Sequence, residues 1–334
     1  MTYAVGRDVR VSSAPAADVG MSSRPSSTPL VSIGIPAFNG GRFVRASLQS
    51  IVDQDYPSLE ILISDDGSAD DSAEICEEFA RRDPRITVIR QAHVGERRNF
   101  NTVLQLARGG YFMWAADHDL WDRRYVSSCV AALESDPRAV LAYAHTMLID
   151  EDDHDLGIMD DELGIYHGRA VERYTTLIWR LTRCNAIYGL MRREAVVRTG
   201  GYGPTPGPDH LVLAKMALQG TFIQLPEVMY FRRQNRPVET PEEQRRRQSL
   251  DLDPSIGKMW VSMPKRRYYR GLRDGHLRAV LQAPIPPRDK ARGIAATLAC
   301  FSARFGVGSR PLRTARHAAR LLPSALRARI AGRP

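Results

Sequence analysis

The sequence lacks the features of disulfide-rich, zinc-binding and membrane-spanning proteins. Its 334 residues include only four cysteines, and none of them belongs to a Cys-x-x-Cys pair. This spacing suggests neither a disulfide framework nor a thiolate zinc site, and it is typical of a reduced, cytoplasmic compartment. No run of eighteen apolar residues occurs. The sequence therefore predicts no membrane-spanning helix.

Glycine-rich phosphate-binding loops are also missing. No G-x-G-x-x-G follows the first expected strand, and no G-x-x-x-x-G-K-S/T occurs anywhere. A phosphorylated ligand would need another source of positive charge, such as a metal ion. Residues 1–29 have no apolar signal core and are rich in Ser, Ala and Pro. We therefore expect a disordered leader there and not a secretory signal.

Charge is distributed unevenly along a chain whose 43% apolar content is ample for a core. The net charge is +9, yet residues 264–334 alone hold seventeen Lys and Arg against two Asp, which leaves −6 for the rest. A mildly acidic body with a strongly basic tail predicts an anionic partner, either a membrane surface or nucleic acid.

Apolar runs and helical spacing alternate through the first half of the chain. Strands are expected at 31–36, 59–64, 86–89, from 111, and at 139–144; helices are expected at 42–54, 70–82, 97–108 and 125–134. Alternation of this kind predicts an α/β fold with a mostly parallel sheet and right-handed crossovers.

The second half of the chain is less regular. Residues 145–168 are expected to form an acidic, solvated loop, although a second metal site there is conceivable. Further expected elements are a helix at 171–181, a strand at 186–191, a rigid loop at 202–208, a helix at 211–219, and short strands at 222–225 and 228–231.

The stretch from Tyr111 to Trp121 is the centre of the predicted site. A buried apolar strand ends there and is followed at once by Asp117 and Asp119. Two carboxylates so close together repel each other unless a positive group lies between them. The pair therefore indicates either a divalent metal that holds a phosphorylated ligand or a solvated turn that caps the next helix.

Polar side chains also follow two other strands, at Phe38-Asn39 and at Asp65-Asp66. The carboxyl ends of parallel strands meet at one edge of a sheet, where ligands of open α/β sheets bind. Three polar clusters at such strand ends favour one site for a nucleotide-type ligand over three independent turns.

These residues, taken in order, resemble family-2 glycosyltransferases of the GT-A fold. The resemblance rests on Ile35 to Gly40, Ser64 to Ser68, Gly95 to Asn99, Asp117 to Asp119, and Pro208 to His210 with Gly220 beyond them. It covers about residues 30–235. Together with a composition rich in Arg and Ala and poor in Lys, it indicates a bacterial protein.

The resemblance implies an inverting, D-x-D type transferase that moves a sugar from a nucleoside-diphosphate sugar to a hydroxyl of a glycan or lipid-linked acceptor. The residues that would bind the nucleotide are Pro36, Ala37, Phe38, Asn39, Asp65, Asp66, Arg98 and Asp117. Asp119, with Asp117, would bind Mn²⁺ or Mg²⁺, the cations that suit carboxylate and phosphate oxygens. Asp209 would be the general base, with His210 as the competing candidate.

The sequence departs from the commoner family pattern in three places. Ala37-Phe38 stands where a Ser or Thr and a Tyr are more usual, and His118 lies between the two acids where relatives often read His-Asp-Asp. Asp209 is followed by His210 where many relatives have a Glu-Asp pair. The direct metal ligand and the base therefore each have two candidates, of which Asp119 and Asp209 are preferred.

The expected domain organisation is a leader at 1–29, a GT-A domain at 30–240 and a basic helical region at 241–334. Within the domain, residues 30–120 would bind the nucleotide and residues 121–240 the acceptor. In the tail, Ile294, Leu298, Phe301 and Phe305 fall on one helical face, and a second amphipathic pattern runs through 312–326. Basic amphipathic helices bind anionic bilayers, which predicts a peripheral protein on the inner face of the plasma membrane; a helical cap packed on the domain is the alternative.

Two other functions remain open at this point. A nucleotidyltransferase would share the sheet and the acidic metal site, but residues 38–42 do not form the Gly-rich, Lys-bearing loop that it favours. A nucleic-acid-binding protein would use the basic tail, which has few aromatic residues and no recognised motif. A transferase of cell-envelope glycan synthesis that binds no nucleic acid is the preferred reading.

Overall fold

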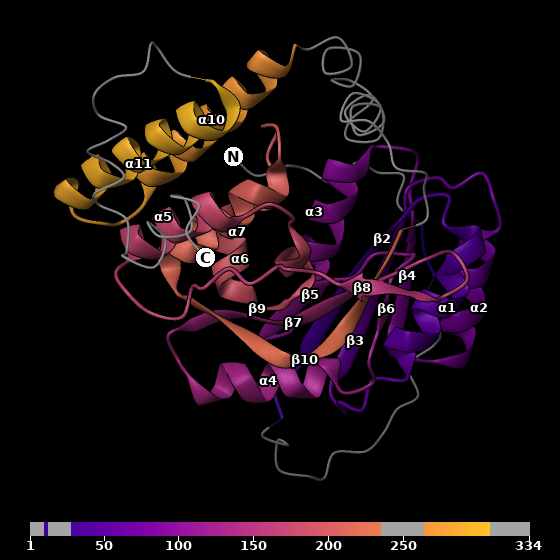
Figure 1. The fold of residues 1–334 in the computed structure, drawn as a ribbon. Coiled ribbons are helices and arrows are strands. Elements are labelled where there is room, and N and C mark those ends of the chain that lie inside the picture. The colour runs from indigo at the N-terminus through magenta and orange to yellow at the C-terminus, as the bar shows by residue number, and fades with distance from the viewer. Residues whose placement is uncertain (1–9, 13–27, 235–263, 308–334) are drawn as a thin grey trace.

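The computed structural model describes residues 10–12, 28–234 and 264–307 (Figure 1). The strands are β1 (Arg10–Ser12), β2 (Val31–Ala37), β3 (Leu59–Asp65), β4 (Ile86–Arg90), β5 (Tyr111–Trp114), β6 (Leu120–Trp121), β7 (Ala139–Ile149), β8 (Asp155–Ile158), β9 (Leu190–Arg192) and β10 (Thr221–Arg233). The helices are α1 (Gly41–Val52), α2 (Ser72–Arg82), α3 (Glu96–Leu106), α4 (Tyr125–Ser135), α5 (Ala170–Arg180), the short 3₁₀ helix η1 (Asn185–Tyr188), α6 (Arg193–Thr199), α7 (Pro208–Gln219), α10 (Lys265–Gln282) and α11 (Pro287–Phe305).

One curled, mixed sheet organises the fold in the order β1-β4-β3-β2-β5-β9-β7-β10-β6, with β8 paired to β7. Strands β4, β3, β2 and β5 are mutually parallel, and β7 is parallel to β10. The short strand β9 is antiparallel to both β5 and β7, so the two parallel groups run in the same direction. The expected α/β fold is confirmed, and the carboxyl ends of its major strands face one edge.

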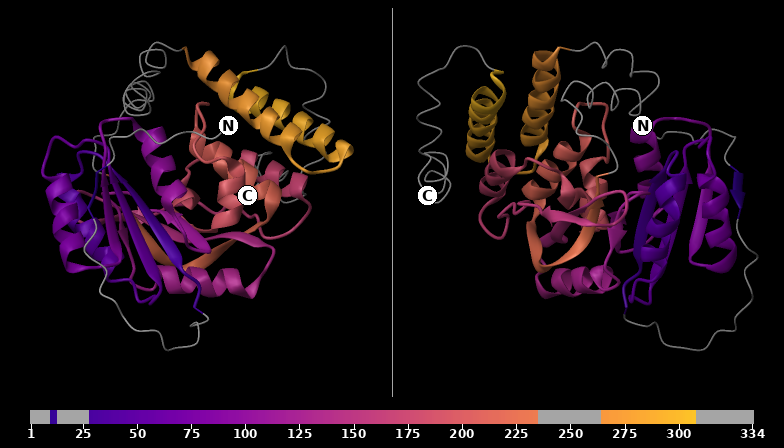
Figure 2. Two further views of the ribbon diagram at one scale, coloured as in Figure 1. Left: turned by 180° about the vertical axis from the view of Figure 1, so that it is seen from behind. Right: turned by 45° about the vertical axis from the view of Figure 1, so that its right-hand side comes forward.

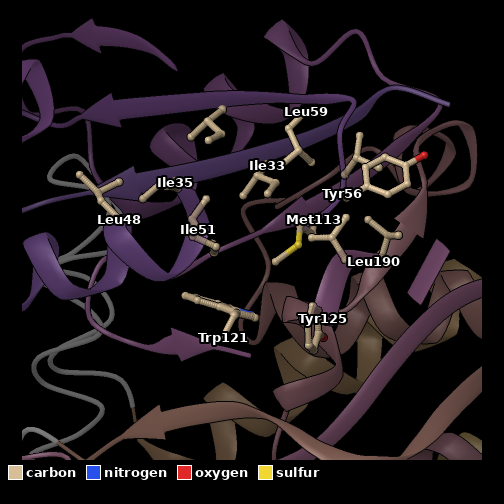
Figure 3. Packing of buried hydrophobic residues seen from close by; sticks show 14 of the residues in the cluster. Ile33, Ile35, Leu48, Ile51, Tyr56, Leu59, Met113, Trp121, Tyr125 and Leu190 are labelled. Atoms are coloured by element: carbon tan, nitrogen blue, oxygen red, sulfur yellow. The ribbon is translucent and has the colours of Figure 1, made fainter. Parts of the chain in front are cut away.

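Helices cover both faces of this sheet (Figure 2). Strand β2 is buried along its whole length, as expected for a parallel strand between two helical layers. On one face α1 and α2 cover the β2–β4 region and α4 covers β7 and β10. Leu48 and Ile51 of α1 lie near Ile33 and Ile35 of β2 there (Figure 3). On the other face Val103 of α3 and helices α5, α6 and α7 form a second cluster.

The structure differs from the sequence expectations where periodicity is short or interrupted. The region 145–168 is not all loop, because β7 continues to Ile149 and β8 pairs back onto it. The strand expected at 186–191 is a 3₁₀ turn followed by the three-residue β9. The two strands expected at 222–231 are one strand, β10, whose pairing with β7 is interrupted by bulges. Part of the expected leader, Arg10–Ser12, is a strand antiparallel to β4.

The described part of the tail packs on the domain. Helix α11 lies against α5, and α10 lies against α7 and α11 (Figures 1 and 2). Val280 of α10 and Cys300 of α11 join the second core cluster. The buried face of α11 includes Phe301 as expected, but Leu298 is 43% exposed, because Thr297 and Cys300 occupy the inward positions beside it. The second amphipathic pattern, at 312–326, lies outside the described residues.

A buried histidine makes this packing sensitive to acid. His276 of α10 is 2% exposed, and its Nδ1 lies 3.3 Å from the hydroxyl of Tyr174, which is 2.7 Å from Thr297 Oγ1. Burial, with nearby His210 adding to the effect, lowers the pKa of His276 to about 3 from 6.5. The folded protein therefore binds fewer protons than the unfolded chain below pH 6.5, and stability is lost as the pH falls toward 3.

We expect His276→Gln to have a flatter stability profile than the wild type. A histidine that stays neutral in the folded protein lowers the free energy of unfolding by about 1.4 kcal/mol for each pH unit below its pKa in the unfolded chain. Between pH 7.5 and 5.0 the free energy of unfolding of the wild type should fall by roughly 2 kcal/mol more than that of the variant, as measured by urea unfolding. Parallel pH profiles for the two proteins would show that His276 does not carry this dependence.

Candidate active site

The loop after β2 and the loop after β5 meet at the carboxyl edge of the sheet. The backbone N–H of Phe38 donates to Asp117 Oδ2 at 3.0 Å. A Cβ on Gly40 would lie 2.7 Å from the same oxygen, so the loop can approach the carboxylate this closely only with glycine there. Asn99 of α3 donates through Nδ2 to the carbonyl oxygen of Ala37 at 3.2 Å. Residues from three expected segments are thus in direct contact.

The two carboxylates after β3 have different environments. Asp66 accepts the N–H groups of Val94 at 2.7 Å and Gly95 at 2.9 Å, and His93 Nδ1 lies 2.9 Å from its Oδ2. Burial raises the pKa of Asp66 above its usual value, although these donors oppose the rise. Asp65 Oδ2 accepts only the N–H of Ser68, at 3.3 Å, and its buried Oδ1 has no hydrogen-bond partner among the described residues.

An exposed aromatic ring borders these acids. Phe38 is 37% exposed, and one face of its ring stacks on His93 with the centroids 4.5 Å apart. Asn39 beside it adopts φ 52°, which an Asn tolerates better than most residues, and its Oδ1 accepts the N–H of Ala69 at 2.8 Å. The turn after β2 is therefore held in shape by the turn after β3.

His118 lies between the carboxylates of the Asp117–Asp119 motif. Its Nδ1 is 2.8 Å from Asp117 Oδ1, and its Nε2 is 3.9 Å from Asp119 Oδ1. Burial alone would lower the pKa of His118, but the charge of Asp119 and the hydrogen bond to Asp117 raise it above the usual value. Both contacts favour the protonated form of His118, which would offset the repulsion expected between the two acids.

The two acids are anchored to opposite sides of the site. Asp117 lies against the loop after β2, whereas Asp119, 1% exposed, lies against the end of β10. Asp119 Oδ1 accepts the N–H of Arg233 at 2.8 Å, and its Oδ2 accepts the hydroxyl of Tyr230. Each carboxylate oxygen of the pair keeps one lone pair beyond these contacts.

The donor set suits a hard divalent cation. Carboxylate oxygens one residue apart are the ligands that Mg²⁺ and Mn²⁺ prefer. Within the described ranges, no group of three or more His, Cys, Asp or Glu side chains converges to enclose a metal ion. A cation held by Asp117 and Asp119 would therefore complete its shell with ligand oxygens and water, which is the usual arrangement for Mg²⁺ bound to phosphates.

Asp209 and His210 begin α7 and face different surroundings. The turn is set by Gly207 at φ 59° and by Pro208 in the first helical turn. Burial, the charge of Asp209 and a hydrogen bond to it raise the pKa of the Cys184 thiol well above its usual value. Asp209 also contributes to the raised pKa values of Tyr188 and Tyr202, after burial in both cases. These effects place Asp209 near Cys184, Tyr188 and Tyr202.

His210 is turned toward the C-terminal helices. Burial lowers its pKa, Asp209 opposes the change, and Arg304 of α11 reinforces it. His210 in turn helps to lower the pKa of His276 of α10. Of the two candidate bases, Asp209 is the one whose neighbours belong to the sheet edge.

Tyr188 and Arg232 are half-buried side chains whose titration responds to the charge of Asp119. Burial, followed by the charges of Asp119 and other groups, raises the pKa of Tyr188, to which Asp209 also contributes. Arg232 donates from its guanidinium to Asn185 Oδ1 at 2.6 Å and acts on the titration of both Tyr188 and Cys184. The charges of Asp119, Arg232 and Asp209 therefore all act on the pKa of Tyr188.

Arg98, which the sequence predicts to bind the nucleotide, is exposed to solvent. It lies in the first turn of α3, next to Asn99. Trp114, by contrast, is fully buried, and its Nε1 donates to the carbonyl oxygen of Phe100 at 3.0 Å, so it belongs to the core.

Sequence reasoning missed several contributors to this edge. Tyr230, Tyr188, Cys184 and His93 carry no motif that would single them out. The adjacent residues Arg232 and Arg233 have different partners, Asn185 and the carbonyl oxygen of His118. The only available signal was the strand pattern before the pair, which places neighbouring residues on opposite faces.

The sheet, its flanking helices and the acidic motif at the strand ends define a GT-A type domain. Solved structures agree on the fold. A fragment of S. aureus TarS in complex with UDP-GlcNAc matches with a TM-score of 0.62 at 14% identity, over 89% of this chain and 82% of that one. The mannosyltransferase PcManGT of Pyrobaculum calidifontis, in complex with GDP-Man and Mn²⁺, matches with a TM-score of 0.50 at 19% identity, over 92% of this chain and 84% of that one.

The sequence comparisons identify the family. The model of glycosyl transferase family 2 matches residues 32–198, and the chain belongs to this family. The glycosyltransferase EpsJ of Bacillus subtilis is 39% identical over 102 residues, which are 30% of this chain and 28% of EpsJ. The match thus spans less than a third of the length of that relative. The expected membership of a family found in bacteria is confirmed.

Proposed function

We propose that the protein transfers a sugar from a nucleoside-diphosphate sugar to a hydroxyl of a glycan or lipid-linked acceptor, with inversion at the anomeric carbon. The observation that carries this proposal is the position of three carboxylates at one sheet edge: Asp65 ends β3, Asp117 contacts the loop after β2, and Asp119 contacts the end of β10. Family membership and the UDP-GlcNAc and GDP-Man complexes of structural neighbours support a nucleotide-sugar donor.

The nucleoside would lie over the loops after β2 and β3. Asp65 Oδ1 is a buried acceptor that lacks a donor among the described residues, and an unsatisfied buried acceptor costs about 1–3 kcal/mol. A base N–H or a ribose hydroxyl would satisfy it. The open face of Phe38, backed by His93, offers a stacking surface for the base. Asp66 would position the Val94-Gly95 turn, and Pro36, Ala37 and Asn39 would shape the floor of this subsite.

The diphosphate would lie between the acids and the basic side chains. Asp117 and Asp119 would hold Mn²⁺ or Mg²⁺, which when bound neutralises the charge that develops on the leaving phosphate. Asp117 is on the nucleotide side and Asp119 on the β10 side, in keeping with Asp119 as the more direct ligand. The guanidinium groups of Arg232, at the same edge, and of Arg98, at the start of α3, would add positive charge next to the diphosphate.

The acceptor would enter beside α7. An alcohol is a poor nucleophile, and Asp209 would take its proton as the oxygen attacks the anomeric carbon. Because the diphosphate leaves from the opposite face, one carboxylate base is enough and no second acid is required. The role of His210 would then be to pack α7 against α10, not to accept the proton.

Titration with nucleoside diphosphates tests the donor half of this proposal. UDP, dTDP, GDP and ADP are titrated calorimetrically with and without Mn²⁺. We expect at least one of the first three to bind, and Mn²⁺ to strengthen its binding. If no nucleotide binds with either metal condition, the assignment of this edge as a nucleotide site is wrong.

We propose that the protein works in cell-envelope glycan synthesis on the cytoplasmic face of the membrane. Among the described helices, none combines the length and the apolar character needed to cross a bilayer. The described cysteines are free thiols, which fits a reducing compartment. The first turns of α10 expose Lys265, Arg266, Arg267 and Arg270. Basic residues near an anionic bilayer contribute about 1 kcal/mol each.

Replacing these four residues by serine is expected to reduce co-sedimentation with phosphatidylglycerol vesicles at least tenfold. A tail truncation is a poor test, because α10 and α11 contribute Val280 and Cys300 to the core. A variant with four other exposed arginines replaced, Arg81, Arg82, Arg123 and Arg124, is the matched control. Equal binding by the two variants would remove the membrane proposal.

A further inference from the structure

The acidic turn, Asp150 to Asp153, joins β7 to β8 and is fixed by arginines from two distant parts of the chain. Arg42 at the start of α1 pairs with Glu151 and lies 3.8 Å from Asp152. Arg233 at the end of β10 pairs with Asp153. A turn that the sequence predicts to be solvated is thus tied both to the nucleotide half and to the acceptor half.

Arg233 is the buried member of this arrangement. Its side chain is 1% exposed, and one guanidinium nitrogen donates to the carbonyl oxygens of Asp150 at 3.0 Å and Glu151 at 3.3 Å. A buried guanidinium must have its donors satisfied, because each unpaired polar group is costly. The backbone of the acidic turn satisfies two of these donors.

The same residue holds the Asp117–Asp119 motif. Arg233 Nε donates to the carbonyl oxygen of His118 at 2.9 Å, and the backbone N–H of Arg233 donates to Asp119 Oδ1 at 2.8 Å. Its guanidinium lies over the ring of Phe43, 4.5 Å from the centroid. Arg233 therefore fixes both the peptide before Asp119 and the orientation of the Asp119 carboxylate.

We propose that Arg233 is a positioning residue. The acidic turn fixes its side chain, and Arg233 in turn orients the Asp119 carboxylate so that it can bind the cation. This inference rests on the proposed function, because it assumes that Asp119 binds a metal ion. Arg232, its neighbour, donates instead to Asn185 on the other side of the strand. The two adjacent arginines thus have separate roles, one toward the ligand and one toward the motif that holds it.

Lysine cannot replace Arg233. Its ammonium is a single point charge with three donors, whereas the guanidinium fork reaches His118 and the acidic turn at once. Loss of an outer partner of a metal ligand costs about 10–100-fold in metal affinity or activity. Arg233→Lys should therefore weaken Mn²⁺ binding by about that factor. It should change the binding of nucleoside diphosphate without metal by less than about threefold, because no described contact of Arg233 reaches the subsite at Asp65.

Arg192→Lys is the matched control. Arg192 also donates to backbone carbonyls, those of Ala139 at 2.8 Å and Leu133 at 2.7 Å, and its guanidinium also lies over an aromatic ring, that of Tyr111. These contacts involve the amino ends of β5 and β7, away from the acidic motif. This variant reports what the loss of a structural arginine does to stability, and it should leave the affinity for Mn²⁺ within about twofold of the wild type.

The experiment measures free Mn²⁺ by EPR in the presence of the diphosphate that binds the wild type most tightly among UDP, dTDP and GDP. Melting temperatures are recorded for each variant. Weak Mn²⁺ binding in Arg233→Lys but not in Arg192→Lys supports the proposal. Affinities of the two variants within about threefold of each other overturn it. If the wild type binds no diphosphate, the proposed function fails and this inference fails with it.

Asp153→Asn is a second variant that tests the role of Arg233 if Arg233→Lys does not fold. Asp153 is half exposed, so its replacement removes the charge that pairs with Arg233 but has little effect on the core. We expect a smaller loss of Mn²⁺ affinity, about threefold, in the same direction, because a partly exposed pair contributes less than a buried one. Unchanged affinity in Asp153→Asn, together with an unfolded Arg233→Lys, would also overturn the proposal.

Discussion

Asp209→Asn is expected to lower kcat by about 10²–10⁴, the usual contribution of a positioned general base. The amide keeps the shape of the carboxylate and can still accept the N–H of His210 at the start of α7, so the fold should persist. Donor binding should change little, because the nucleotide subsite proposed above lies at Asp65 and Phe38. Steady-state kinetics and calorimetric titration of the donor nucleotide together measure these two effects.

His210→Gln is the control for this prediction. His210 packs toward α10 and α11, so its replacement should reduce stability more than turnover. We expect kcat within about tenfold of the wild type in this variant. If His210→Gln had no transferase activity while Asp209→Asn remained active, the general base would be His210.

Asp119→Asn is expected to abolish metal-dependent transfer, with a loss of kcat of at least about 10². The amide is a much weaker ligand for a hard cation than a carboxylate. Asparagine is preferable to alanine here, because alanine would leave the Tyr230 hydroxyl and the Arg233 N–H unpaired in a buried place. Each such loss costs about 1–3 kcal/mol and would confound activity with folding.

Tyr230→Phe separates the two effects. It removes the hydroxyl that donates to Asp119 but leaves both carboxylate oxygens in place. We expect a loss of stability of about 1 kcal/mol and a much smaller loss of activity than in Asp119→Asn. Kinetics over a range of Mn²⁺ concentrations provide the readout. If Asp119→Asn transfers sugar at the wild-type rate, Asp119 is not the metal ligand.

The sequence predicts the fold of residues 30–120 well because its signals there are local. Strands such as 59–64 are short, mostly apolar runs that end in a polar cluster, and a helix with one apolar face follows. Parallel strands then bring Asp65 and Asp117 to one edge without further information. The contact of Phe38 with Asp117 follows from this topology.

The fold of residues 121–234 depends on contacts between distant residues that no local pattern encodes. The strand β7 continues to Ile149 because it pairs with β8 and β10 and not because of its own periodicity. The acidic turn looks solvated in sequence, but Arg233, more than eighty residues away, binds it. The inward face of α11 uses Thr297 and Cys300, whose small side chains fit close packing better than the larger Leu298.

The most direct test of the central claim is the release of nucleoside diphosphate from a panel of UDP-, dTDP- and GDP-sugars with Mn²⁺ or Mg²⁺. Each donor is incubated with the purified full chain, alone and with glycan and lipid-linked acceptors. The account predicts that at least one donor releases its diphosphate, that the metal is required, and that Asp119→Asn and Asp209→Asn do not support release. The account is contradicted if the wild type releases no diphosphate from any donor, or if the wild type and both variants release it equally.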